Sequence, residues 1–165
     1  MRPWQVDDAD FLFDLESRPE TVQYLGPQAR PMFEVREAVE SIQRRRMLDD
    51  PIHGIWAIVD RDTGELLGNV LAKPAPLSRG VTRVTRVEIG WHLHPDAQGF
   101  GYATEAAVAV LDDVARSGLS AVIALTDPRN VASQRVCSRL RMESRGATSD
   151  FYDETNLLFE KSLSQ

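Results

Sequence analysis

Residues 87–106 constrain the fold most strongly, because the hydrophobic pattern changes its period within them at a pair of glycines. Before the glycines, apolar residues alternate with polar or small ones, as in a β-strand: Val87, Ile89, Trp91 and Leu93. Pro95 has no N–H group and ends that strand. After Gly101 the apolar residues recur at helical spacing, and Gly118 is placed to end the helix. The run therefore predicts a strand, a tight turn and a long helix.

The turn itself is predicted to bind a phosphate-bearing ligand. Gly99 and Gly101 permit backbone angles that are closed to other residues and let a ligand approach the main chain. The first helical turn offers free N–H groups that carry about half a positive charge. An ordinary strand-to-helix connection is the alternative, because glycine turns are common. A Walker loop is excluded, since Tyr102 and Ala103 stand where Lys and Ser or Thr are needed; a dinucleotide fingerprint stays open, although Thr104 replaces its third small residue.

The turn sequence, Gln98-Gly99-Phe100-Gly101-Tyr102-Ala103, resembles the Gln/Arg-x-x-Gly-x-Gly/Ala motif of the GNAT superfamily of acyl-CoA-dependent N-acetyltransferases. The wider run from Glu88 to Ala106 resembles the branch that acetylates the N-termini of ribosomal proteins. A second segment, Asn130-Val131-Ala132-Ser133, is similar to an Asn-x-x-Ser helix of that branch. The specific resemblance covers about residues 84–144. It implies an α/β fold with a mixed, mostly antiparallel sheet flanked by helices.

The resemblance also implies acetyl-CoA as cosubstrate. Backbone amides from about Gln98 to Ala103 would hold the coenzyme A pyrophosphate, and the strand end near Leu93 would pair with the pantetheine arm and supply an N–H group for the developing oxyanion. Asn130 is either the N-cap of its helix or also a coenzyme contact. The residues implied in coenzyme binding are Leu93, Gln98, Gly99, Phe100, Gly101, Tyr102, Ala103, Thr104 and Asn130.

The implied reaction is direct attack of an amine on the thioester, which requires a base. Glu88 is the first choice, because it lies on the motif strand and a carboxylate can take a proton directly or through water. The alternative is a structural carboxylate paired with Arg83 or Arg86. His92 shares the face of Glu88 and is an alternative base, although a histidine on a strand is more often a packing residue. His92 and His94 have no third partner, so we expect no metal site.

The leaving thiolate requires a proton donor, and Cys137 stands where many superfamily members have a tyrosine in that role. Ser133 matches the serine that the N-terminal acetylase branch places near the thiol, and Cys137 would assist from one helical turn later. Alternatively, Ser133 is a first-turn helix residue and Cys137 a small apolar core residue. The missing tyrosine also keeps open a different function, a non-catalytic acyl-CoA sensor or interaction module with the same fold.

Composition limits the partners. With 165 residues and 42% hydrophobic content, the chain is expected to form one domain, residues 1–165. The net charge of −6 argues against general nucleic-acid binding and favours cationic acceptors such as a protein N-terminus, a polyamine, an amino sugar or a small amine. The single cysteine excludes an internal disulfide and suits the cytoplasm. No signal core or membrane-length apolar run is found, and a homodimer stays open.

The flanking segments fit the family in outline. The patterns predict helices after Asp7 and over 35–46, a loop-like stretch over 19–31, and strands at 55–59, 66–72, 121–126, 143–147 and 156–160. Arg44, Arg45 and Arg46 are expected at a solvated helix end. Arg2-Pro3-Trp4 stands where relatives close their first strand, so most of that strand is expected to be missing. Either the true start lies upstream, or the sheet is one short strand poorer.

Two further features of the flanks concern the acceptor and a turn. The candidate walls of the acceptor site are the segments around Tyr24, Trp56 and Tyr152, whose aromatic rings are equally compatible with core packing. Arg141-Met142 replaces a Gly-Phe pair that is frequent in the family. We expect that change to affect the turn into the next strand more than the chemistry.

Overall fold

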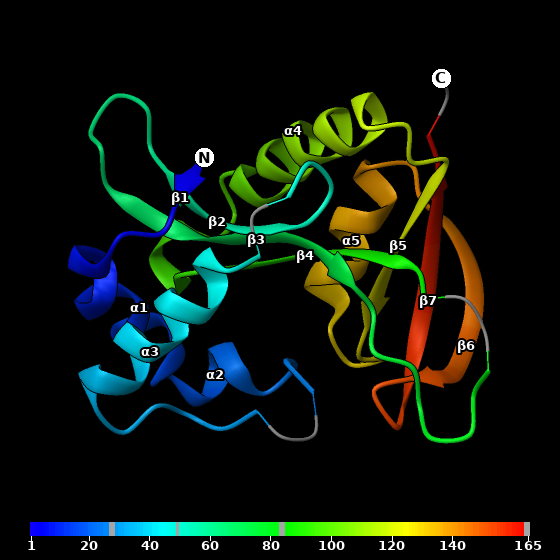
Figure 1. The fold of residues 1–165 in the computed structure, drawn as a ribbon, viewed down its shortest axis with the longest axis horizontal. Coiled ribbons are helices and arrows are strands. Elements are labelled where there is room, and N and C mark those ends of the chain that lie inside the picture. Colours follow the sequence, from blue (N-terminus) through cyan, green and yellow to red (C-terminus); the bar gives the residue numbers. More distant parts are fainter. Residues whose placement is uncertain (27–28, 49, 83–84, 164–165) are drawn as a thin grey trace.

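The computed structural model describes residues 1–26, 29–48, 50–82 and 85–163. Within them, a seven-stranded sheet in the order β1-β2-β3-β4-β5-β7-β6 forms the centre (Figure 1). Its strands are β1 (Arg2–Pro3), β2 (Gly54–Val59), β3 (Leu66–Pro74), β4 (Val87–Leu93), β5 (Ala121–Thr126), β6 (Glu143–Phe151) and β7 (Glu154–Ser162). Only β4 and β5 run parallel among the paired strands described, which confirms the predicted mixed, mostly antiparallel sheet.

Helices cover the two faces of the sheet (Figure 1). On one face lie α4 (Tyr102–Arg116) and α5 (Val131–Arg139); on the other lie α1 (Ala9–Glu16), α2 (Pro19–Val22) and α3 (Val35–Arg46). Short 3₁₀ turns at Val6–Asp8 and Pro95–Ala97 precede α1 and α4. Side-chain alternation in β2 connects both layers, because Ala57 packs in the cluster with α1 and α3 while Ile58 packs in the cluster with α4.

The sheet divides between β4 and β5. The two strands are paired only at Glu88 and Ile123, whereas β3 stays paired with β4 as far as Leu93 and β7 stays paired with β5 as far as Thr126. Because parallel strands end at the same edge of a sheet, the connections into α4 and α5 both meet this split. The split is the feature that positions the site.

The predicted strand, turn and helix of the motif are confirmed. Gly101 has a φ of +91° at the N-cap of α4, and Gly118 has a φ of +82° just after the helix ends. The expected loop over 19–31 is wrong in part, because Pro19 occupies the first position of α2, where its fixed φ favours a helix. The first strand is present as the two residues of β1, paired with β2.

The expectation of a solvated arginine cluster at the end of α3 fails for Arg45. This residue shares the face of α3 that carries Ala38 and Ile42, and both of those are fully buried. Its guanidinium pairs with Glu16 and donates to Asn69 Oδ1 at 3.0 Å, which leaves the Arg45 side chain 10% exposed. Helical periodicity therefore directs Arg45 inward, where it connects α3 to α1 and to the sheet.

Candidate active site

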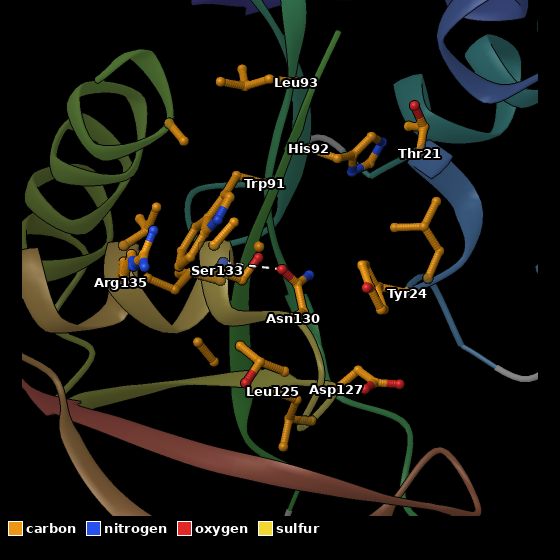
Figure 2. A pocket seen from close by; sticks show the side chains of 18 of the residues that line it. Thr21, Tyr24, Trp91, His92, Leu93, Leu125, Asp127, Asn130, Ser133 and Arg135 are labelled. Atoms are coloured by element: carbon orange, nitrogen blue, oxygen red, sulfur yellow. Dashed lines mark hydrogen bonds between the residues drawn. The ribbon is translucent and has the colours of Figure 1, made fainter. Parts of the chain in front are cut away.

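A cavity of about 650 Å³ opens where β4 and β5 separate (Figure 2). Its walls come from β3, β4, the turn before α4, the start of α5, the segment around α2 and the β6–β7 hairpin. Many of the residues predicted for the site line it together: Glu88, Leu93, Gln98, Gly99, Gly101, Ala103, Thr104, Asn130 and Ser133. The tertiary structure thus brings both sequence motifs to one cavity.

The turn before α4 presents unpaired backbone donors. Among the described residues, none accepts a hydrogen bond from the backbone N–H groups of Gly99 through Thr104. Gly101 caps the helix without a side-chain bond, so the positive end of α4 is left uncovered. Such an array of N–H groups binds phosphate oxygens. The Gln98 side chain closes the connection by donating to Leu93 O at 3.3 Å.

Two predicted coenzyme residues contribute only their backbone to this turn. The side chains of Phe100 and Tyr102 line a separate surface depression, with ring centroids 5.9 Å apart, and Phe100 is 72% exposed. The predicted coenzyme role of these two residues therefore rests on their backbone N–H groups and not on their rings.

Buried hydroxyl groups along the cavity lack protein partners. Thr104 Oγ1 in α4 and Thr126 Oγ1 in β5 are both inaccessible and make no hydrogen bond to any described residue. Buried polar atoms are nearly always paired in native proteins. Both threonines line the cavity, so their placement fits a ligand rich in hydrogen-bonding groups, as a nucleotide-bearing coenzyme is.

Glu88 lies where β4 and β5 are still joined and is only 8% exposed. Its Oε2 accepts a hydrogen bond of 2.5 Å from the hydroxyl of Tyr152. Burial raises the pKa of Glu88, while the Tyr152 hydrogen bond and the charge of Lys73 oppose that rise. The pairing considered with Arg86 is wrong, because Arg86 bonds Glu160 at 3.1 Å; Arg83 lies outside the described residues.

The start of α5 places the second motif beside the cavity (Figure 2). Asn130 Oδ1 accepts from the Ser133 N–H at 3.1 Å, so Asn130 is the N-cap, and both residues also line the cavity. Cys137 is a correction. It is 0% exposed in the apolar cluster beneath α5 and is not among the residues that line the cavity; burial raises the pKa of its thiol to about 12. A thiol in that setting is a packing group.

His92 lies on the side of β4 that faces Thr21 and Tyr24 (Figure 2). Its Nε2 is 3.2 Å from Glu16 Oε1, the carboxylate that also pairs with Arg45. The neighbouring His94 instead contacts Asp14 at 2.9 Å. Within the part of the chain that the structure describes, no three metal-ligating side chains gather at one point.

Two of the three aromatic residues predicted for the acceptor site line the cavity. Tyr24 and Tyr152 line the cavity, whereas Trp56 packs against the main core. Arg129 bounds one side of the cavity, because it bonds Asp127 at 2.8 Å and its guanidinium lies 5.9 Å from the centre of the Tyr24 ring. The contact between Tyr152 and Glu88 was not predictable from local patterns, since the two residues are 64 positions apart.

Comparison with known proteins settles the family. The family model described as "Acetyltransferase (GNAT) domain" matches residues 1–143. The chain belongs to the GNAT acetyltransferases. The uncharacterized N-acetyltransferase p20 of Bacillus licheniformis is 27% identical over 156 residues, which are 92% of this chain and 82% of that protein.

Solved structures show the same GNAT fold. Ribosomal-protein-S5-alanine acetyltransferase of Vibrio fischeri aligns with a TM-score of 0.75 at 18% identity, over 99% of this chain and 92% of the other. The protein yncA of Salmonella typhimurium, solved with its cofactor acetyl-CoA, aligns with a TM-score of 0.71 at 15% identity, over 99% and 93%. The protein is therefore an acetyltransferase by family, with a fold shared by the ribosomal-protein branch. None of its described helices is both long and apolar enough to cross a membrane.

Proposed function

We propose that this GNAT protein transfers the acetyl group of acetyl-CoA to a primary amine, either a protein N-terminus or a small amine, by direct attack in a ternary complex. One observation carries the proposal. The split between β4 and β5 has the uncovered N-terminus of α4 at its open end and the buried carboxylate of Glu88 at its closed end. A phosphate-binding turn and a candidate base thus share one cavity.

The coenzyme would occupy the open side of the split. The free N–H groups from Gly99 to Thr104 suit its pyrophosphate, and Arg135 and Arg139 add positive charge to the α5 wall of the cavity. Beyond Glu88, no described strand pairs with the edge of β4 that faces β5, so the peptide groups of that edge are available to the amide groups of a pantetheine arm. Holding both substrates there contributes on the order of 7–11 kcal/mol in favourable intramolecular models.

Glu88 is assigned as the base and Ser133 as the hydroxyl beside the coenzyme sulfur. The carboxylate takes the proton that the amine loses, and the serine hydroxyl supplies a hydrogen bond to the departing thiolate. His92 is the competing base on the same strand face, but its Nε2 is engaged by Glu16. Parallel kinetics of Glu88→Gln, His92→Gln and Ser133→Ala test these roles.

Ligand binding is the first test. Thermal unfolding is followed with acetyl-CoA, free CoA and NAD in parallel, since a ligand at a hundred times its Kd adds about 2.7 kcal/mol to the free energy of unfolding. Stabilisation by both coenzyme A forms and not by NAD is expected. Stabilisation by NAD alone would replace the proposal with a dinucleotide enzyme, and no stabilisation by any of the three would remove the coenzyme site.

Turnover is the second test. A panel of amines, including peptides with free N-termini, polyamines and amino sugars, is incubated with acetyl-CoA, and acetylated products are identified by mass spectrometry. Glu88→Gln should lower kcat by about 10²- to 10⁴-fold and leave the Kd of acetyl-CoA unchanged. The matched control is Glu65→Gln, an exposed glutamate in the β2–β3 turn. Unchanged kcat in Glu88→Gln would exclude Glu88 as the base.

The same amine panel distinguishes the transferase from the alternative function, a non-catalytic acyl-CoA sensor. A non-catalytic acyl-CoA sensor would bind acetyl-CoA and transfer its acetyl group to no amine of the panel. The buried position of Cys137 removes one expected proton donor, yet Ser133 and Tyr152 both line the cavity. The structure thus retains hydroxyl groups near the site, which favours the enzyme over the sensor.

A further inference from the structure

The β6–β7 hairpin presents Tyr152 from an unfavourable backbone conformation. Its two-residue turn consists of Tyr152 and Asp153, with φ values of +63° and +55°. Hairpin turns with positive φ at both positions strongly favour Asn-Gly or Asp-Gly. A bulky aromatic residue in this region is a conformational outlier and persists only where its surroundings enforce it.

The enforcing contacts come from the loop that follows β3. The Tyr152 N–H donates to Pro76 O at 3.2 Å, and the Asp153 N–H donates to Ser78 Oγ at 2.9 Å. In return, Asp153 Oδ1 accepts from the Arg79 N–H at 2.8 Å. Both turn residues are therefore fixed from outside the hairpin, and the strained turn holds the tyrosine ring in one place.

The Tyr152 ring is held with its hydroxyl against the carboxylate of Glu88. The Tyr152 hydroxyl donates to Glu88 Oε2, and Lys73, the β3 residue paired with Glu88, has its Nζ 5.4 Å from the centre of the Tyr152 ring. On the β5 side the residue paired with Glu88 is the apolar Ile123. Among the described residues, Tyr152 and Lys73 are thus the two groups that offset the burial of the Glu88 charge.

We propose that Tyr152 is a positioning residue for Glu88, whose hydroxyl fixes one carboxylate oxygen so that the other oxygen is the proton acceptor. This inference rests on the proposed function. In the step concerned, an N–H bond of the substrate ammonium breaks, its electron pair stays on nitrogen as the lone pair of the neutral amine that attacks the thioester, and an O–H bond forms at Glu88 Oε1. The tyrosine proton does not move to the substrate; the hydroxyl donates to Oε2 throughout.

The decisive experiment is a titration of Glu88 in the free protein by ¹³C NMR of labelled glutamate carboxyls, with the resonance assigned from its loss in Glu88→Gln. Tyr152→Phe keeps the ring and removes the hydroxyl, so the pKa of Glu88 should rise by about one to two pH units. Lys73→Met removes the positive charge near the Glu88 carboxylate and should also raise the pKa of Glu88. Ser149→Ala is the matched control, because it deletes a hydrogen bond of the same hairpin, to Thr155, that does not involve Glu88.

Kinetics gives the second readout. A base must be ionised, so the acid limb of kcat/KM should move to higher pH in Tyr152→Phe by the same amount as the NMR titration, while the plateau above it is retained. An unmoved titration overturns the inference. A lowered plateau with an unmoved acid limb also overturns it, because Tyr152 would then donate a proton itself. Since the titration requires neither coenzyme nor turnover, its result stands even where the proposed transferase activity fails.

Discussion

Glu16 joins the helical layer to the sheet through a buried ionic cluster, and its removal has a pH-dependent consequence. The Glu16 side chain is 11% exposed and contacts Arg45 and His92. Burial opposes its charge, but the hydrogen bond to His92 and the charges of Arg45 and His92 outweigh burial and lower the pKa of Glu16 to about 2. A carboxyl with a lowered folded-state pKa stabilises the protein above its unfolded pKa and loses that contribution as the pH falls through the folded value.

The magnitude follows from the lowered pKa. From an ordinary value of 4.5 to about 2, the ionised form is favoured in the folded state by about 3 kcal/mol at pH 7. Glu16→Gln should lose about that much, because Arg45 is left buried beside a neutral amide. At pH 3 the ionised Glu16 still stabilises the wild type by only about 1.4 kcal/mol. The difference in free energy of unfolding between wild type and Glu16→Gln should therefore be smaller at pH 3 than at pH 7 by about 2 kcal/mol.

Urea unfolding at pH 7, 5, 4 and 3, followed by tryptophan fluorescence, measures this difference directly. Comparing wild type with variant at each pH cancels the titration of all other carboxyl groups. The control is Glu143→Gln, which breaks a surface pair with Arg145 and should lose less than about 1 kcal/mol at pH 7. The reasoning is refuted if the difference in free energy of unfolding between wild type and Glu16→Gln stays constant from pH 7 to pH 3.

Two further substitutions, each with a control substitution, test local backbone geometry. Gly101→Ala forces an L-residue to a φ of +91° at the head of α4, where space is open, so strain alone should weaken acetyl-CoA binding by about tenfold in calorimetry. Gly118→Ala, at +82° just past the other end of α4, should cost similar stability and leave that affinity unchanged; equal affinity losses would contradict the assignment. Arg141→Gly should raise the free energy of unfolding by about 0.5–1 kcal/mol, because Arg141 holds a φ of +56° after α5. Arg139→Gly, inside the last turn of α5, should lower it by about 1 kcal/mol, and a destabilised Arg141→Gly would show that the turn is unstrained.

The local conformation of the site was predictable because it depends on neighbours in the sequence. The change of hydrophobic period around Gly99 and Gly101 reflects the repeats of a strand and a helix, and it placed β4, the turn and α4 correctly. Arg141, which replaces a frequent family glycine, has a positive φ, and the backbone angle of a single residue is the kind of local feature that a sequence can indicate. Helical spacing alone, however, left open whether Cys137 faces the cavity or the core.

The sequence by itself therefore determined the glycine turn between β4 and α4, most of the helices and strands, and the resemblance to the acetyltransferase family that comparison confirmed. Only the tertiary structure decided which side chains meet. Glu88 and Tyr152 are 64 residues apart, and Glu16 and Arg45 are 29 apart. Such pairs depend on strand register, on where β4 and β5 separate, and on which helix face packs inward. These are properties of the assembled layers, because side-chain contacts at long sequence separation are set by packing and not by local backbone preference.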